Sequence, residues 1–298
     1  MLKDLRKIIA WQDLISIILI LFFIKISFLE SFAFETSLTY YGLFILIIAC
    51  TFIVSAGSFI NYYYKKVKDL TFFSKKQLLY AYFILASAGV LLGSYISLNI
   101  DKPFFILVFF FATVSTVWFA KNSYPKTILN NIFPSFIKSS SFILIWWMDS
   151  PISLNMVQWE IFLKIEVLII YFIAISFIGN FIRSVIIDLK NFKFNRKKNE
   201  ETLPVVFGEK AAKKIIIVMA YSVTFLTLAL ILYLRKSIFS ALVIFIFMIV
   251  PQTLCIRKLI KSKTEKDYSK LIKGLSIILL LGVLAIPLIS YFIKDVIL

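Results

Sequence analysis

The chain has 298 residues, of which 61% are hydrophobic and 16% are charged, and its mean hydropathy is +0.93. A soluble domain of this length could not cover so much apolar surface with so few charged side chains, so a soluble globular protein is excluded. Lysine and arginine outnumber aspartate and glutamate by 33 to 16, and histidine is absent, which excludes imidazole ligation of haem, Ser-His-Asp catalysis and histidine metal sites.

Apolar segments of membrane-spanning length recur along the whole chain. One spanning helix needs about 20 mostly apolar residues, and nine segments meet this requirement, near residues 11–29, 38–60, 78–98, 103–120, 128–148, 161–187, 214–234, 237–256 and 271–293. The segment 128–148 is the weakest, because Asn130, Asn131, Lys138 and four serines interrupt it. The first segment is long enough to span, and no small-residue cleavage site follows it, so we expect no cleaved signal peptide. The sequence therefore predicts an all-α, polytopic membrane bundle of about nine transmembrane helices in a single domain, 1–298.

The basic residues predict the orientation of these helices. With nine spans, 25 lysines and arginines lie at the N-terminus and in alternate loops, against 4 in the remaining loops and the C-terminal end. By the positive-inside rule, the N-terminus is cytoplasmic and the C-terminus lies on the other side of the cell's inner (cytoplasmic) membrane. The three largest polar insertions, 61–77, 188–213 and 257–273, then face the cytoplasm, beside anionic lipid and phosphorylated substrates. The net charge of +17 therefore requires no nucleic-acid partner.

The end of the second span carries a regular polar pattern. Asn61, Lys65 and Asp69 are spaced four apart, so they share one face of a helix. A solvated helix end would produce this pattern, and so would a modified phosphate-binding site. The two cysteines, Cys50 and Cys255, lie inside apolar segments, so any metal would be a hard, oxygen-liganded ion such as Mg²⁺.

The end of the sixth span repeats the pattern. Asp188, Asn191 and Asn195 stand at i, i+3 and i+7, again on one helical face. The stretch "NRKKNEE" that follows is typical of a solvated charge run. We expect Thr202–Gly208, "TLPVVFG", to form a loop with Pro204 as its breaker, before the next span begins near Lys213.

These two stretches together resemble the UbiA-type membrane prenyltransferases. That family carries N-D-x-x-D-x-x-x-D at the end of its second span, and R-x-x-x-x-D-x-x-D-x-x-x-D followed by T-L-P-V-x-x-G at the end of its sixth. The second pattern matches here at Arg183, Asp188, Asn191, Asn195, Thr202, Leu203, Pro204, Val205 and Gly208, and the first aligns with Asn61, Tyr62, Lys65 and Asp69. A looser aromatic-x-x-K…P…N match places Lys121, Pro125 and Asn130 or Asn131. The resemblance covers essentially the whole chain and implies the family's fold.

The resemblance also implies a reaction and its site residues. A polyprenyl group would pass from its diphosphate to a lipid or aromatic acceptor, while Mg²⁺ held by aspartates neutralises the leaving diphosphate. Of six aspartate positions in the two motifs, this sequence keeps Asp69 and Asp188, the implied catalytic residues. With Asn61 they would form a weak Mg²⁺ site. The implied residues that bind the isoprenoid diphosphate or another lipid ligand are Asn61, Tyr62, Lys65, Lys121, Asn130, Arg183, Asn191 and Asn195.

The substitutions leave the chemistry open. The charge of the six positions falls from about −6 to near zero, and one unit of charge at 4 Å is worth about 4 kcal/mol at an effective dielectric near 20. We therefore expect weak or absent Mg²⁺ binding. Either cationic side chains hold the diphosphate as point charges (Lys65, Lys66, Lys68, Lys121 and Arg183), or the protein is catalytically inactive and binds an isoprenoid lipid or a membrane partner. A small-molecule transporter is a third alternative.

Two further features bear on this choice. The family's R-P-x-x-x-G loop is missing after the first motif, which favours loss of catalysis, whereas the retained aspartates favour some activity. Arg183 precedes Asp188 by five residues, about 140° around a straight helix, so the two side chains meet only if the helix bends. Gly179 and Asn180 offer a place for such a bend; otherwise Arg183 extends to the cytoplasmic interface.

Overall fold

The computed structural model describes residues 4–5, 8–64, 73–122 and 126–297. Within these ranges the chain is helical without strands, apart from one isolated parallel bridge between Thr127 and Glu201. The prediction of an all-α protein is confirmed. The chain groups into two compact units: the first comprises Met1–Phe22, Thr36–Tyr124 and Trp147–Ser150, and the second Phe23–Glu35, Pro125–Trp146 and Pro151–Leu298. The single domain over 1–298 stays a prediction.

The helices follow the predicted spans closely. In chain order they are α2 (Trp11–Phe23), the π-helix η1 (Ile24–Glu30), α3 (Tyr40–Tyr64), α4 (Lys75–Asn99), α5 (Phe104–Asn122), α6 (Leu129–Met148), α7 (Met156–Lys190), α8 (Phe192–Lys197), α9 (Leu203–Phe207), α10 (Glu209–Tyr233), α11 (Ile238–Ile244), the π-helix η2 (Phe245–Ile249), α12 (Val250–Lys261) and α13 (Glu265–Ile297). In the described chain, eight helical segments are long and apolar enough to cross a membrane. The remaining predicted span, 128–148, is present as the 20-residue helix α6. It is not among those eight, in keeping with the polar residues that interrupt it.

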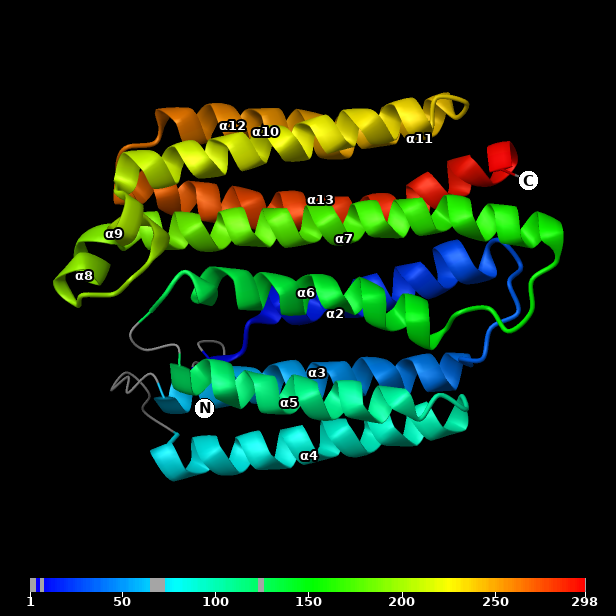
Figure 1. Cartoon of the computed structure of the whole chain (residues 1–298), viewed down its shortest axis with the longest axis horizontal. Coiled ribbons are helices and arrows are strands. Elements are labelled where there is room, and N and C mark those ends of the chain that lie inside the picture. The colour runs from blue at the N-terminus through cyan, green and yellow to red at the C-terminus, as the bar shows by residue number, and fades with distance from the viewer. Residues whose placement is uncertain (1–3, 6–7, 65–72, 123–125, 298) are drawn as a thin grey trace. The chain divides into compact units, whose positions relative to one another are not determined.

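In the first unit, α3, α4 and α5 pack side by side through small residues (Figure 1). A Cβ added to Gly89 of α4 would lie 2.7 Å from Ile53 Cγ1 of α3, and one added to Gly93 would lie 2.5 Å from the Phe109 ring of α5. Helix association inside a bilayer depends on such close van der Waals packing, because lipid tails are as apolar as the side chains. The i, i+4 glycines therefore set the distance between these helices.

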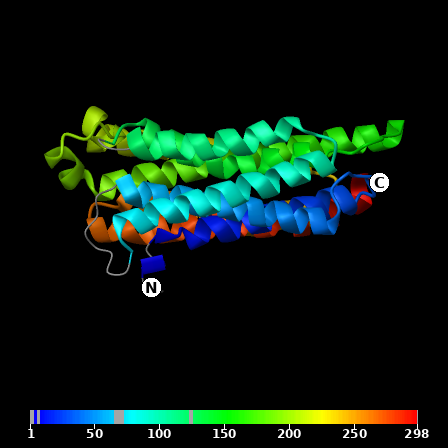
Figure 2. The ribbon, with the colours of Figure 1, turned by 90° about the horizontal axis from the view of Figure 1, so that it is seen from below.

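In the second unit, the long helices α7, α10 and α13 and the shorter α12 run alongside one another (Figure 1); Figure 2 shows the same ribbon turned by 90°. Their shared core includes Val185, Ile186 and Ile216, each completely buried. The Trp146 ring of α6 stacks on Phe162 of α7 at 4.8 Å between ring centroids. With 35 residues, α7 is about 52 Å long at 1.5 Å per residue. A hydrocarbon core is about 30 Å thick, so α7 can carry its last turns beyond the membrane interior.

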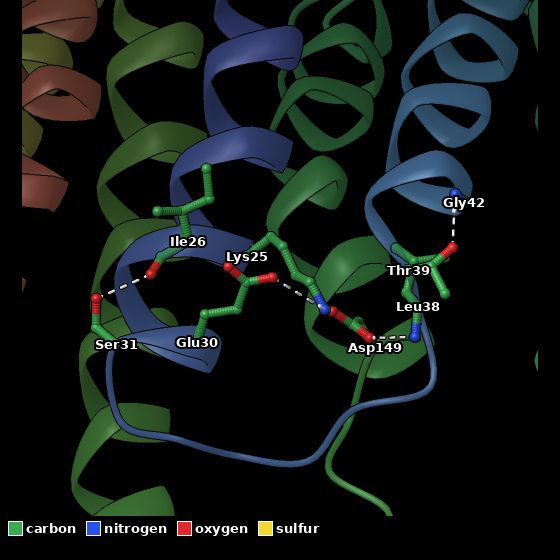
Figure 3. A network of polar contacts seen from close by, with 8 residues as sticks. All are labelled: Lys25, Ile26, Glu30, Ser31, Leu38, Thr39, Gly42 and Asp149. Atoms are coloured by element: carbon green, nitrogen blue, oxygen red, sulfur yellow. Dashed lines mark hydrogen bonds and ion pairs between the residues drawn. The ribbon is translucent and has the colours of Figure 1, made fainter.

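Figure 3 shows polar contacts of residues 25–31, which belong to the second unit, and of residues 38–42 and 149, which belong to the first. In the second unit, the buried Lys25 Nζ lies 3.7 Å from Glu30 Oε1 inside η1. In the first unit, the backbone N–H of Leu38 donates to Asp149 Oδ1 at 2.8 Å, just before α3 begins. Pairing Lys25 with a carboxylate lowers the cost of placing a charge within a membrane-spanning segment.

Two predictions about the polar insertions were wrong. The expected loop Thr202–Gly208 contains the short helix α9, because a proline fits the first turn of a helix, where its missing N–H has no partner to lose. The next helix begins at Glu209 rather than near Lys213, directly after Gly208 at φ +87° and ψ 152°. This backbone conformation is essentially limited to glycine. The insertion 257–273 is likewise mostly helical, since only residues 262–264 separate α12 from α13.

Candidate functional site

The residues of the second motif gather where α7 ends and α8 and α9 follow (Figure 1). Asp188 lies in the last turn of α7 and is 4% exposed, while Asn195 of α8 is completely buried. Backbone hydrogen bonds continue through the junction, since Asn191 N donates to Ile187 O at 3.1 Å and Asn195 N donates to Asn191 O at 2.9 Å. The prediction that Asp188, Asn191 and Asn195 share one face of a single helix is wrong, because α7 ends at its C-cap residue Asn191 and Asn195 belongs to the separate helix α8. Asn195 nevertheless lies near Asp188.

A lysine from a distant segment meets this carboxylate. Lys126 Nζ lies 3.7 Å from Asp188 Oδ1, and the side chains are 27% and 5% exposed respectively. The backbone of Lys126 is held in place, because Glu201 N donates to its carbonyl oxygen at 2.7 Å and Thr127 forms a parallel bridge with Glu201. The chain before α6 is thus anchored to the chain between α8 and α9.

The two asparagines at the start of α6 have different roles. Asn130 Oδ1 accepts hydrogen bonds from Thr127 N at 2.7 Å and Thr127 Oγ1 at 3.1 Å, which orders the first turn of α6. Asn131 is 2% exposed, and its Oδ1 accepts from Ser184 Oγ of α7 at 2.6 Å. From the sequence, Asn130 was placed among the ligand-binding residues, with Asn131 as an alternative in the looser motif match; it is Asn131 that reaches α7 beside the second motif.

The site contains an unusual concentration of buried polar atoms without hydrogen-bond partners: Asn131 Nδ2, Asp188 Oδ2, both side-chain atoms of Asn195, Glu200 Oε2 and Thr202 Oγ1. The amides of Asn131 and Asn195 are near enough to Asp188 to stabilise its charge, but their geometry does not meet that of a hydrogen bond. An unsatisfied buried polar group costs about 1–3 kcal/mol, and such groups are few in native proteins. Those of Asn131, Asp188 and Asn195 lie near one another, as is typical of a site that receives a polar ligand.

The other predicted site residues are placed as follows. In the first unit, Asn61 and Tyr62 occupy the end of α3, where Asn61 Oδ1 is buried without a hydrogen-bond partner. Lys121 is exposed near the end of α5. Lys65 and Asp69 lie outside the described residues. The first motif belongs to one unit and the second motif to the other, so no arrangement between them is described.

Arg183 is half-buried on α7. The helix runs unbroken through Gly179 and Asn180, where Asn180 Nδ2 donates to Ser176 O at 2.9 Å. The bend that would bring Arg183 to Asp188 is therefore absent from this helix, and the two residues keep their separation of about 140° around its axis. The cation that faces Asp188 at ion-pair distance is Lys126.

The second-motif site does not fit the Mg²⁺ pair that the family resemblance implies. Mg²⁺ requires near-octahedral oxygen ligation, supplied in proteins by one or two carboxylates and several other oxygens. Among the described residues, no group of three or more His, Cys, Asp or Glu side chains could hold a metal. At this site Asp188 faces the ammonium of Lys126, and its amide neighbours supply no charge.

Four residues near the site were not predicted as site residues from the sequence. Lys126 and Ser184 were not singled out, Glu200 lay in a stretch interpreted as a solvated charge run, and Thr202 was treated as part of a loop. Arg196, Lys197 and Lys198 are indeed exposed, but Glu200 is 4% exposed and Thr202 is completely buried. The one sequence signal for Thr202 was its place at the start of T-L-P-V-x-x-G.

Comparison with known proteins supports the fold. No protein-family model matches the sequence, and no curated protein matches it closely enough to count as a relative. Among solved structures, the chain is similar to one from a study of digeranylgeranylglyceryl phosphate synthase in membranes, with a TM-score of 0.68 and 15% sequence identity over 96% of this chain and 95% of that one. The chain therefore has the fold of a UbiA-type membrane prenyltransferase.

Proposed function

We propose that this protein is a UbiA-like prenyltransferase, which transfers a polyprenyl group from its diphosphate to a lipid or aromatic acceptor. The observation that carries the proposal is the cluster at the end of α7, where Lys126, Asn131, Asp188 and Asn195 meet. Two of its members, Asp188 and Asn195, stand at positions of the family's second motif, in a chain with the fold of a membrane prenyltransferase.

The cluster has the groups that this reaction needs at its leaving group. As the bond between the allylic carbon and the diphosphate oxygen breaks, positive charge spreads over the allyl group and negative charge grows on the diphosphate. Lys126, with its side chain 27% exposed, can donate charge-assisted hydrogen bonds to phosphate oxygens. A preorganised cation of this kind lowers the energy of the developing anion.

The orientation and acceptor are part of the proposal. The basic loops favour a cytoplasmic N-terminus in the inner membrane, which puts the end of α7 at the cytoplasmic mouth of the bundle, where diphosphate substrates are found. The structurally similar protein is called a digeranylgeranylglyceryl phosphate synthase, so a glyceryl phosphate bearing one geranylgeranyl chain is the first lipid acceptor to test.

A second candidate function is binding of an isoprenoid lipid or a membrane partner without catalysis. The observation in its favour is that Tyr62, Lys65, Asn191 and Asn195 replace aspartates of the family pattern. An amide oxygen can coordinate a cation but adds no charge, so these changes weaken the metal-assisted departure of diphosphate on which the family relies.

The two candidates are separated by a transfer assay. Purified protein in lipid nanodiscs is incubated with radiolabelled geranylgeranyl diphosphate and, in parallel, the glyceryl phosphate acceptor or a hydroxylated aromatic acid. The proposal expects a labelled product that disappears in Asn195→Ala and persists in Lys197→Ala, which changes an exposed residue of α8. Binding of the diphosphate without any labelled product would favour the non-catalytic candidate. Absence of both binding and transfer would refute the transferase and the binding of an isoprenoid diphosphate.

A further inference from the structure

We infer that Lys126 takes the place of a metal ion in the second-motif site, so that its ammonium, held by Asp188, binds the isoprenoid diphosphate without Mg²⁺. The inference rests on the proposed function in one respect, the identity of the ligand. It departs from the Mg²⁺ dependence that the family resemblance implies, because the described residues of this site do not fit that ion.

In this ion pair the cationic side chain is more exposed than the carboxylate, which is the reverse of what a metal-binding carboxylate requires. In a carboxylate-held metal site, the carboxylates must present their oxygens to the incoming ion. Here the Asp188 side chain is 5% exposed, whereas that of Lys126 is 27% exposed. The anion is therefore buried behind the cation, and the group offered to a ligand is the ammonium.

The ion pair leaves the ammonium free to bind a phosphate. A charge-assisted N–H···O hydrogen bond is about 2.7–2.9 Å long, and the distance from Lys126 Nζ to Asp188 Oδ1 is 3.7 Å. An ammonium has three N–H donors, so at this distance Asp188 attracts the charge without using all of them. A diphosphate oxygen can accept from the remainder.

The backbone around Lys126 is fixed as a binding residue requires. Glu201 N donates to the Lys126 carbonyl at 2.7 Å, and Asn130 Oδ1 accepts from Thr127 N at 2.7 Å. Ordering a lysine side chain costs up to about 2 kcal/mol of rotamer entropy. The anchored backbone and Asp188 meet this cost before a ligand arrives, which is the general advantage of a preorganised site.

Neighbouring atoms supply the remaining recognition. Asn131 Nδ2 and Asn195 Nδ2 are amide donors, and Thr202 Oγ1 is a hydroxyl that can donate; all three are buried without hydrogen-bond partners. Phosphate oxygens are strong acceptors for such groups. The carboxylates of Asp188 and Glu200 are buried, so the charge that the site exposes is the Lys126 ammonium; an anion would be attracted there, and a divalent cation would meet its repulsion.

The test measures binding of geranylgeranyl diphosphate to the full chain in nanodiscs, with excess Mg²⁺ or with EDTA. For the unmodified protein we expect affinities in the two conditions to agree within about twofold. Lys126→Ala should weaken binding about tenfold or more in both, the loss expected for one charge-assisted hydrogen bond, and Lys126→Arg should retain most of it. Lys197→Ala is the charge-matched control on α8 and should bind as the unmodified protein does.

Asp188→Asn decides between the two mechanisms by whether binding survives. If Lys126 is the binding group, binding should persist in Mg²⁺ and in EDTA, because the ammonium remains, and the loss of a competing carboxylate offsets the loss of its positioning effect. If a carboxylate-held metal is the binding group, Asp188→Asn and EDTA should each abolish binding, and that result overturns the inference. This arm remains decisive even where Lys126→Ala fails to fold.

The outcomes also separate the inference from the proposed function. Binding that persists in EDTA, without prenyl transfer to any acceptor, would refute the transferase and leave the role of Lys126 intact. Prenyl transfer that depends on Mg²⁺, together with binding lost in EDTA, would support the transferase and refute the inference.

Discussion

Removing the cation beside Asp188 tests whether the ion pair organises the end of α7. Lys126→Met keeps the length of the side chain but deletes the ammonium that lies 3.7 Å from the buried carboxylate. At that distance two unit charges interact by about 4.5 kcal/mol at an effective dielectric near 20, and by about 1 kcal/mol in water. Because Lys126 is partly exposed, we expect the variant to lose about 2–3 kcal/mol of unfolding free energy, less than the 3–5 kcal/mol typical of fully buried pairs.

Substitution of the other partner, Asp188→Asn, should lower the free energy of unfolding by less. In Asp188→Asn the remaining charge is on Lys126, whose side chain is 27% exposed and can turn toward water. We expect a loss of about 1 kcal/mol or less. The double variant should be close to Asp188→Asn alone, so that the double-mutant cycle gives a coupling energy of about 2 kcal/mol.

The chain contains a suitable reporter for this measurement. Cys255 of α12 is partly buried against the core of the second unit, and Cys50 is buried in α3 of the first. In a Cys50→Ser background, reaction of a thiol-specific dye with Cys255 follows the unfolding of the second unit. At a fixed heating rate, which matters where unfolding is irreversible, Lys126→Met should lower Tm by about 5–10 °C.

Additive effects of the two substitutions on Tm would refute the coupling between Lys126 and Asp188. If Lys126→Met and Asp188→Asn change Tm by amounts that simply add in the double variant, the two side chains are not coupled. The ion pair would then be screened by solvent, and neither the cluster nor the proposed role of Lys126 could be organised around it.

Three more predictions concern packing and backbone. Gly93→Ala should lower the free energy of unfolding by about 1–3 kcal/mol, as overpacking does, because its Cβ would lie 2.5 Å from the Phe109 ring. Phe109→Leu in the same chain should restore part of the loss, so the double variant should have a higher Tm than Gly93→Ala alone. Thr202→Val, isosteric at a completely buried hydroxyl that lacks a hydrogen-bond partner, should raise Tm or leave it unchanged while weakening diphosphate binding; a clear fall in Tm would mean that the hydroxyl stabilises the fold instead. Gly208→Ala should destabilise by about 1–3 kcal/mol, because φ is +87° there although a Cβ would meet nothing within 4 Å. Its control is Gly274→Ala in α13, also in open space, which should be neutral or stabilising by up to about 1 kcal/mol.

The parts of the site that the sequence predicted are those governed by local rules. Asp188, Asn191 and Asn195 were assigned to one polar cluster at the end of the sixth span, and Asp188 and Asn195 lie near each other, although on the two helices α7 and α8 that Asn191 separates. The position of α6 was also predicted, along with its weakness as a span, because both follow from the side chains within it.

The predictions that were wrong or incomplete involve segments without their own periodicity. The chain from Thr202 to Gly208 resembles a loop, since proline and glycine are close together, yet five of its residues, Leu203–Phe207, form α9. Glu200 reads as one charge among several on a solvated run, and its burial depends on neighbours that are remote in the sequence. Side-chain type alone does not separate a buried carboxylate from an exposed one.

The sequence by itself determined that this protein is a helical membrane bundle, where its spans lie, and which residues near the ends of its helices carry polar chemistry. These properties follow from hydropathy and from the 3.6-residue period, which act over one or a few helical turns. Only the tertiary structure decided which cation meets Asp188. Lys126 comes to it from another segment, through the packing of α6 on α7 and the bridge between Thr127 and Glu201. A contact between segments so far apart depends on how helices pack against each other, and no local pattern contains that information.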